Sequence, residues 1–133
     1  METYALALAV VRYADKYLIG KRAVTKRFAQ GKWEFISGFI DSSESAEKTI
    51  ARKMFKETNL SGTIIQSGYP YILINDQERW IVAPFLVEAQ SNQVRLNGED
   101  HEELRWVNSE DLDDFPDLKH DVQALKARSL IPT

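Results

Sequence analysis

The sequence predicts an α+β fold in which mixed α/β layers surround one sheet. Its 133 residues are the length of one domain, so we expect a single unit over residues 1–133. Apolar patterns follow one another in the order strands, helix, strands, helix, with no repeat, low-complexity tract or linker between them. A hydrophobic content of 44% and a charged content of 28% are ordinary for a globular protein and exclude disorder, collagen and coiled coil.

The first part of the chain predicts a β-hairpin followed by a basic loop. Apolar stretches at 3–12 and 17–23 are separated by a short polar turn at residues 14–16. The loop after the hairpin carries five basic residues and no acid, namely Lys21, Arg22, Lys26, Arg27 and Lys32. It is either a solvated segment or an anion-binding one. A short strand at 33–35 and a turn at Ser37-Gly38 come next.

The clearest element is a helix from Ser45 to Thr58. Its apolar residues recur along one helical face, and they are Ala46, Ile50, Ala51, Met54 and Phe55. Ser45 and the serines just before it offer hydroxyls for a helix N-cap. Asn59 tolerates a left-handed backbone and is expected to end the helix.

The second half of the chain predicts further strands and then short helices. Two strand-like runs at 62–74 and 79–89 are joined by a polar connection. A strand at 102–107 precedes a short capped helix that begins at Ser109 and a last helix over 117–129. Two tryptophans are expected in the core, Trp33 and Trp106. Three aromatic residues fit either a base-binding pocket or a half-buried sheet face, and they are Tyr69, Tyr71 and Trp80.

Charge and composition limit the partners of the protein. Seventeen basic and twenty acidic residues give a net charge of -3, which predicts no binding to nucleic acid or to a membrane surface. The absence of cysteine excludes thiolate nucleophiles and Cys-ligated metals. The longest apolar run has eight residues, Tyr4–Val11, and the first residues lack the positive charge of a secretion signal. We therefore expect a cytoplasmic protein with a small-molecule partner.

The segment from Gly38 to Leu60 carries the functional signal. A glycine turn feeds an acidic loop and then the amphipathic helix. Its spacing resembles the signature of the Nudix (MutT-like) hydrolases, with six positions in register: Gly38, Glu44, Arg52, Met54, Glu57 and Leu60. Residues 18–22, 31–35 and 103–107 look like strands of the same family. The resemblance covers roughly residues 4 to 129.

The resemblance implies a Nudix fold, a mixed α/β/α sandwich with the sheet between helices. It also implies hydrolysis of a nucleoside diphosphate linked to another group, dependent on Mg²⁺ or Mn²⁺, and by analogy it allows a homodimer. Glu44 and Arg52 resemble the structural ion pair of the family. On a helix, positions 53, 56 and 57 share one face, where three carboxylates would bind divalent cations. Here Lys53 and Lys56 replace two of them, and Glu57 alone remains.

A reduced metal site is one interpretation of this departure. Glu57, Asp100 and the backbone carbonyl near Gly38 would hold one Mg²⁺, which needs only one or two carboxylates besides phosphate oxygens. His101 matches the place of a histidine base in the GDP-mannose mannosyl hydrolase branch, and Glu103 is the other candidate base. The expected phosphate contacts are Arg22, Lys53 and Lys56. Phe39 stands where that branch has a phosphate-contacting arginine, so its substrate does not carry over.

Two other interpretations remain open. The chain is an inactive nucleotide-binding module if Lys53 and Lys56 pair with a diphosphate without activating water. It is a scaffold without a nucleotide role if these lysines only form a solvated helix face. A role specific to oxidised guanine is disfavoured, because Lys119 stands where those family members commonly carry an asparagine.

Overall fold

The computed structural model describes residues 1–26, 28, 30–120 and 126–132. One mixed eight-stranded sheet runs through this part of the chain. Its strands are β1 (Glu2–Tyr13), β2 (Lys16–Arg22), β3 (Trp33–Glu34), β4 (Ile36–Phe39), β5 (Gly62–Ser67), β6 (Tyr71–Ile74), β7 (Glu78–Ala89) and β8 (His101–Asn108). The helices are α1 (Ala46–Thr58), the 3-10 helix η1 (Ser109–Asp114) and α2 (Pro116–His120).

Strand β1 is the centre of the sheet. It runs parallel to β7 from the pair Glu2↔Glu78 to the pair Arg12↔Glu88, and antiparallel to β4 over Leu6–Ala9. The predicted hairpin is confirmed, because β1 turns into β2 through Ala14 and Asp15, which have φ values of 49° and 65°. Strand β2 also pairs antiparallel with β8 along its whole length and with β3 near its end.

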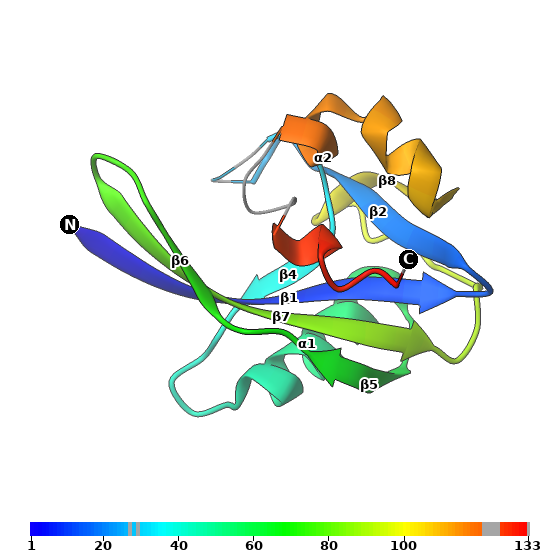
Figure 1. Cartoon of the computed structure of the whole chain (residues 1–133), viewed down its shortest axis with the longest axis horizontal. Helices are drawn as coiled ribbons and strands as arrows, with labels where there is room; N and C mark the ends of the chain where they lie inside the picture. The colour runs from blue at the N-terminus through cyan, green and yellow to red at the C-terminus, as the bar shows by residue number, and fades with distance from the viewer. Residues whose placement is uncertain (27, 29, 121–125, 133) are drawn as a thin grey trace.

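Both faces of β1 are buried, and each supports its own apolar core. Leu6, Leu8 and Val10 belong to the core that is covered by η1 and α2. The intervening Ala7, Ala9 and Val11 belong to the core beneath α1. Figure 1 shows α1 on one side of the sheet and the later helices on the other. The expected α+β fold, with a mixed sheet between helices, is therefore confirmed.

Helix α1 begins and ends where its sequence predicts. The Ser45 hydroxyl accepts a hydrogen bond from the Lys48 backbone N–H at 3.2 Å, and Asn59 closes the helix in the left-handed region with φ 64°. Ile50 and Met54 are each 1% exposed and pack into the core beneath the sheet. Lys53 and Glu57, which are charged residues of α1, line the site described below.

The later elements differ from the sequence prediction in detail. The run 62–74 forms two strands, β5 and β6, with a break at 68–70 that contains a glycine and a proline. The short helix after β8 is a 3-10 helix. The last predicted helix is only partly described. Helix α2 covers its start and residues 126–128 are helical, whereas residues 121–125 lie outside the described residues. Arg27 of the basic loop also lies outside them.

The two expected core tryptophans are packed against the cores but remain partly exposed. Trp33 contacts the ring of Phe115 at a centroid distance of 5.1 Å and lies under the Arg105 guanidinium. The Trp106 indole N–H donates to the Asn92 carbonyl at 3.1 Å. Among the other aromatic residues, Tyr69 is 96% exposed, which places it outside any pocket.

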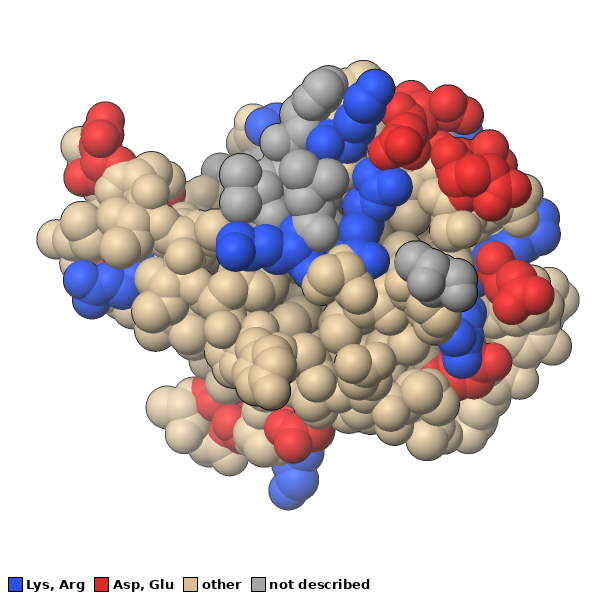
Figure 2. All heavy atoms as spheres, viewed as in Figure 1, with Lys and Arg blue, Asp and Glu red and all other residues tan. Residues whose placement is uncertain are grey.

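Charge is distributed unevenly over the surface. Figure 2 shows acidic side chains gathered at one end of the visible face, where η1 carries the sequence SEDLDD, and Lys and Arg side chains beside them. The net charge therefore does not describe the local potential at a given site. None of the helices in the described part of the chain has the length and apolar character needed to cross a membrane.

We expect that replacing Ile50 by Ala destabilises the protein by about 2 to 4 kcal/mol, because the lost side chain leaves a cavity between α1 and the sheet. Phe55→Ala is the matched control on the same helix, because Phe55 is 55% exposed and its removal should change stability by no more than about 0.5 kcal/mol. Urea unfolding followed by circular dichroism measures both. Equal losses in the two variants would contradict this account of α1 packing.

Candidate functional site

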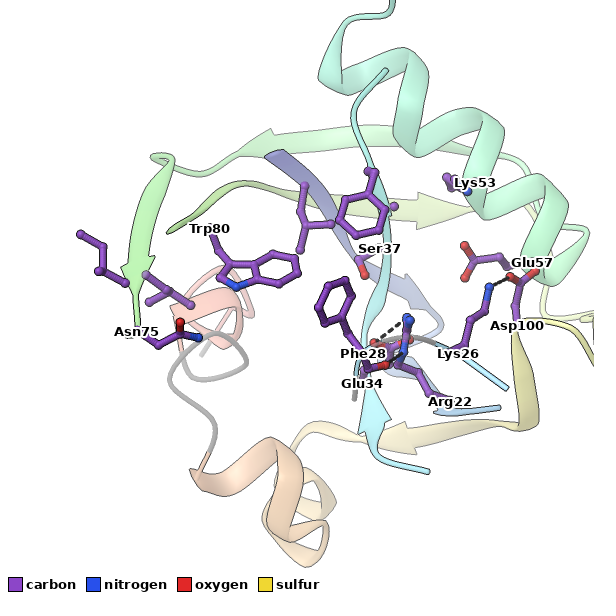
Figure 3. A pocket seen from close by; sticks show the side chains of 15 residues that line it. Arg22, Lys26, Phe28, Glu34, Ser37, Lys53, Glu57, Asn75, Trp80 and Asp100 are labelled. Carbon is purple, nitrogen blue, oxygen red and sulfur yellow. Dashed lines mark hydrogen bonds and ion pairs between the residues drawn. The ribbon is translucent and has the colours of Figure 1, made fainter. Parts of the chain in front are cut away.

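A cavity of about 350 Å³ lies beside β4 and has two chemically different ends. In Figure 3, Trp80 and Asn75 lie at one end, and Glu57, Lys26 and Asp100 lie at the other. We call the first the aromatic end, where Phe28, Phe39 and Trp80 line the cavity and Tyr4 stacks on Trp80 without lining it. We call the second the charged end, formed by Arg22, Lys26, Glu34, Lys53, Glu57 and Asp100. The volume is in the range of small-molecule sites.

Glu57 lies in the last turn of α1 and is 5% exposed. Burial raises the pKa of its carboxyl to about 7, and the negative charges of Asp100 and Glu34 add to this effect while His101 opposes it. The α1 register therefore holds Glu57 at the charged end in an environment where its proton is easily gained or lost near neutral pH.

Asp100 immediately precedes β8 and is 3% exposed. Its Oδ1 accepts a hydrogen bond from the Lys26 ammonium at 2.6 Å, and the Lys56 ammonium lies 3.9 Å from the same atom. Burial acts to raise the pKa of Asp100, but the bond to Lys26 and the charges of Lys26 and Lys56 hold it below the usual value. Asp100 is thus an ionised carboxylate, and its Oδ2 is buried without a hydrogen-bond partner among the described residues.

His101 lies behind the carboxylates and does not line the cavity. It is 1% exposed, its Nε2 is 3.2 Å from Glu34 Oε2, and its Nδ1 is 3.8 Å from Glu57 Oε1. Gly20 makes room for the ring, since a Cβ there would lie 2.5 Å from His101 Cδ2. The base role of His101 therefore stays a prediction. In this structure its Nε2 contacts Glu34, and its buried Nδ1 faces Glu57 without a hydrogen-bond partner among the described residues.

Glu34 is a site residue that the sequence analysis missed. It lines the cavity from β3, and its carboxylate also accepts a hydrogen bond from the Arg22 guanidinium at 3.2 Å. The register between β2 and β8 shifts at Arg22, and this irregularity brings Arg22 and His101 to the same carboxylate. The only sequence signal was an isolated acid between two aromatic residues, which is also ordinary in a strand.

Lys53 and Lys56, the lysines that replace carboxylates in the signature helix α1, lie at different positions relative to the cavity. Lys53 lines the cavity and packs over Gly38, where a Cβ would lie 2.4 Å from Lys53 Cγ. Burial, followed by repulsion from Lys56, lowers the pKa of Lys53. The side chain of Lys56 is 46% exposed and reaches the charged end from its rim. Arg22 and Lys53 line the charged end, with Arg22 paired to Glu34, and Lys56 lies 3.9 Å from Asp100, so their role as phosphate contacts stays a prediction.

The remaining predicted residues lie away from the cavity. Glu44 and Arg52 form a two-bond ion pair at 2.7 and 2.9 Å that ties the loop before α1 to the helix. Glu103 pairs with Arg105 at 2.6 Å, its side chain is 45% exposed, and it does not line the cavity. The base role of Glu103 stays a prediction, and its pairing with Arg105 outside the cavity lining does not favour it.

The aromatic end is a cluster of four rings from three strands and the basic loop. Trp80 stacks on Tyr4 at 4.6 Å, contacts Phe28 edge to face at 5.1 Å and stacks on Phe39 at 6.1 Å. The parallel register of β1 and β7 places Tyr4 opposite Trp80. Such a wall can pack against a planar ring of a ligand. Sequence analysis found Trp80 but not its partners, because they come together only in the sheet.

The charged end offers a hard cation the carboxylates of Glu57 and Asp100, since that of Glu34 is paired with Arg22, but no complete cage. In the part of the chain that is described, no three His, Asp or Glu side chains converge as a metal-binding group. The buried Oδ2 of Asp100, which has no partner among the described residues, is nevertheless the kind of oxygen that Mg²⁺ binds. Glu57 and Asp100 line the same cavity, and a cation bound to them would need waters or ligand oxygens in its remaining positions.

Comparisons with known proteins agree with this architecture. Residues 3–128 match the NUDIX domain model. The NAD-capped RNA hydrolase NudC of Actinobacillus succinogenes is 27% identical over 105 residues, which are 76% of this chain and 38% of the relative. The RNA pyrophosphohydrolase of Shewanella denitrificans is 27% identical over 105 residues, 62% of this chain and 60% of the relative. The chain thus spans less than two thirds of either relative.

A solved NUDIX hydrolase from Nitrosomonas europaea superposes with a TM-score of 0.79, at 15% identity, over 96% of this chain and 87% of that one. At this identity the superposition shows a shared fold. The superposition supports the mixed sheet and the position of α1. The domain model separately covers nearly the whole sequence, including α1. The chain therefore belongs to the Nudix family.

Proposed function

We propose that this protein hydrolyses a nucleoside diphosphate derivative in a Mg²⁺-dependent reaction with a reduced metal site. The observation that carries the proposal is the two-ended cavity, in which an aromatic wall and two buried carboxylates with nearby lysines face the same space. A nucleoside diphosphate has this division, with a planar base at one end and phosphates at the other. The substrate class includes nucleoside triphosphates and nucleotide sugars.

The cation would be held by Glu57 and Asp100, with the backbone carbonyl of Gly38 as a third ligand. When bound, Mg²⁺ or Mn²⁺ polarises phosphoryl oxygens and lowers the pKa of an attacking water. Lys53, Lys56 and Arg22 neutralise the phosphates, and Lys56 does so from the rim. His101 keeps Glu34 and Glu57 in position, which makes it a positioning residue in this proposal.

The relatives extend the range of substrates worth testing. Their names describe hydrolysis of NAD-capped RNA and of RNA pyrophosphate, so the net-charge argument against nucleic acid does not exclude the 5′ end of an RNA as substrate. Nucleotide sugars stay in the range because of the resemblance around His101. A panel of nucleoside triphosphates, nucleotide sugars, NAD and 5′-capped or triphosphorylated RNA, assayed with Mg²⁺ and Mn²⁺ for released phosphate or nucleotide, tests the proposal. Absence of product from every substrate would reject it.

An inactive nucleotide-binding module is the second candidate. The contact between Lys26 and Asp100 and the positions of Lys53 and Lys56 favour it, because ammonium groups neutralise phosphate without activating water. Nucleotide affinity that persists in EDTA, together with no turnover of the panel, would support this candidate over hydrolysis.

We expect Glu57→Gln to lower kcat by at least about a hundredfold, since the amide removes one of two carboxylates that would bind the cation. Glu47→Gln is the matched control, because Glu47 lies in the first turn of the same helix and is exposed. Initial rates with the best substrate of the panel measure the effect. An unchanged rate in the Glu57 variant would remove Glu57 from the metal site.

The same variant should be more stable than the wild type at alkaline pH in EDTA. The folded pKa of Glu57 is raised from 4.5 to about 7, so its stabilising contribution is complete below the unfolded value and is lost as the pH rises through the folded one. The glutamine in Glu57→Gln cannot ionise. The free energy of unfolding of the variant, relative to the wild type, should therefore rise by roughly 1 to 3 kcal/mol between pH 5 and pH 8. Urea unfolding at both pH values measures it, and a constant difference between the two proteins would contradict the burial of an ionisable Glu57.

Trp80→Ala should weaken binding of a nucleoside diphosphate about tenfold, because loss of ring stacking costs on the order of 1 to 3 kcal/mol. Binding of inorganic pyrophosphate should not change, since it has no ring to contact Trp80. Trp80→Phe keeps an aromatic ring at the position and is the control. Isothermal titration calorimetry compares the two ligands. Equal losses for both would show that Trp80 supports the cavity as a whole and does not contact the base.

A further inference from the structure

A lysine from the basic loop already sits on the carboxylate that would hold the cation. The Lys26 ammonium lies 2.6 Å from Asp100 Oδ1, and its side chain is 29% exposed while that of Asp100 is 4% exposed. Figure 3 shows Lys26 reaching along the charged end toward Asp100 and Glu57. A hydrogen bond between two charged groups at this distance is among the stronger ones in proteins.

The backbone fixes this contact from both sides. The Ala23 N–H donates to the Asp100 carbonyl at 3.1 Å, so the start of the loop is attached to Asp100 itself. The Lys26 N–H donates back to the Ala23 carbonyl at 3.1 Å and closes a turn. The loop is therefore held within reach of the carboxylate, and Lys26 behaves as a tethered cation with a high local concentration.

The contact with Lys26 engages only one of the two oxygens of the Asp100 carboxylate. Oδ2 is buried and has no hydrogen-bond partner among the described residues, and Lys56 remains 3.9 Å from Oδ1. Leaving a buried acceptor without a partner costs free energy of folding, so Asp100 Oδ2 can still accept a ligand that the Lys26 ammonium does not provide. A divalent cation would fill it, but the positive charge of Lys26 opposes its entry as long as the ammonium stays on Oδ1.

We propose, on the basis of the proposed function, that Lys26 is an internal competitor for the divalent cation and couples cation binding to diphosphate binding. In the free protein Lys26 occupies Asp100 and keeps cation affinity low. When a diphosphate enters with the cation, the ammonium leaves Asp100 and pairs with a phosphate oxygen that lies in the same cavity. Each ligand thereby raises the affinity of the other by the same factor, as linkage requires.

The first test is Mn²⁺ binding without any substrate. We expect Lys26→Met to bind Mn²⁺ about tenfold or more tightly than the wild type, as measured by the electron paramagnetic resonance signal of free Mn²⁺. Lys26→Arg keeps a cation on Asp100 and should bind as weakly as the wild type. Lys21→Met removes the same charge from the neighbouring strand, where Lys21 pairs with Glu102 at 3.7 Å, and should leave Mn²⁺ affinity unchanged. Adding Asp100→Asn to Lys26→Met should abolish the gain.

The second test measures the coupling. Methylenediphosphonate, a pyrophosphate analogue that is not hydrolysed, should tighten Mn²⁺ binding about tenfold in the wild type, and most of that gain should disappear in Lys26→Met. Mn²⁺ affinity of Lys26→Met equal to that of the wild type would overturn the proposal, and so would undiminished coupling in that variant. Both readouts are independent of turnover, so a protein that hydrolyses no substrate and still shows these affinities would reject the proposed function and retain the competitor role of Lys26. A melting temperature within a few degrees of the wild type confirms that each variant is folded.

Discussion

Two carboxylates, Glu57 and Asp100, are buried in the same corner of the protein, where the end of α1 meets the start of β8. A buried carboxylate must be protonated or be compensated by positive charge. The two residues meet this requirement differently. Burial raises the pKa of Glu57 to about 7, whereas the charge of Asp100 is compensated by an ion pair with Lys26. His101 lies between Glu34 and Glu57, and Lys26 and Lys56 lie next to Asp100.

This arrangement explains how a Nudix protein can keep only Glu57 of the three acids expected at positions 53, 56 and 57 of α1. Lys53 and Lys56 add positive charge where carboxylates would add negative charge, so the charged end is close to balanced without a bound ion. A balanced site holds a cation weakly until a ligand brings its own negative charge. Phosphate oxygens would supply that charge, and for this reason the proposed hydrolysis, the alternative of nucleotide binding and the proposed competitor role of Lys26 all depend on the same few side chains.

The fold places the two ends of the cavity at a fixed separation. The parallel pairing of β1 and β7 aligns Tyr4 with Trp80 at the aromatic end, and the antiparallel pairing of β1 and β4 presents Ser37 and Gly38 between the two ends. Since β1 is buried on both faces, a change in its register would move every one of these residues at once.

Local sequence determined the elements whose signals lie within a few residues. Helix α1, with its cap at Ser45 and its end at Asn59, follows from short-range hydrogen bonding and periodicity, and the β1–β2 hairpin follows from its polar turn. The register of the box also identified Glu57, Lys53 and the pair Glu44 and Arg52, because one helix and its preceding loop contain all of them. Asp100 was found only through the resemblance.

Tertiary structure decided what depends on contacts between distant segments. The burial of His101 against Gly20, the exclusion of Glu103 and the recruitment of Glu34 depend on how β8, β2 and β3 pair, which no single segment specifies. The ion pair of Lys26 with Asp100 joins residues 74 positions apart. The physical reason is that burial and electrostatic compensation are properties of the assembled sheet, where a side chain is defined by its neighbours in space, whereas helix caps, turns and periodicity are properties of the chain itself.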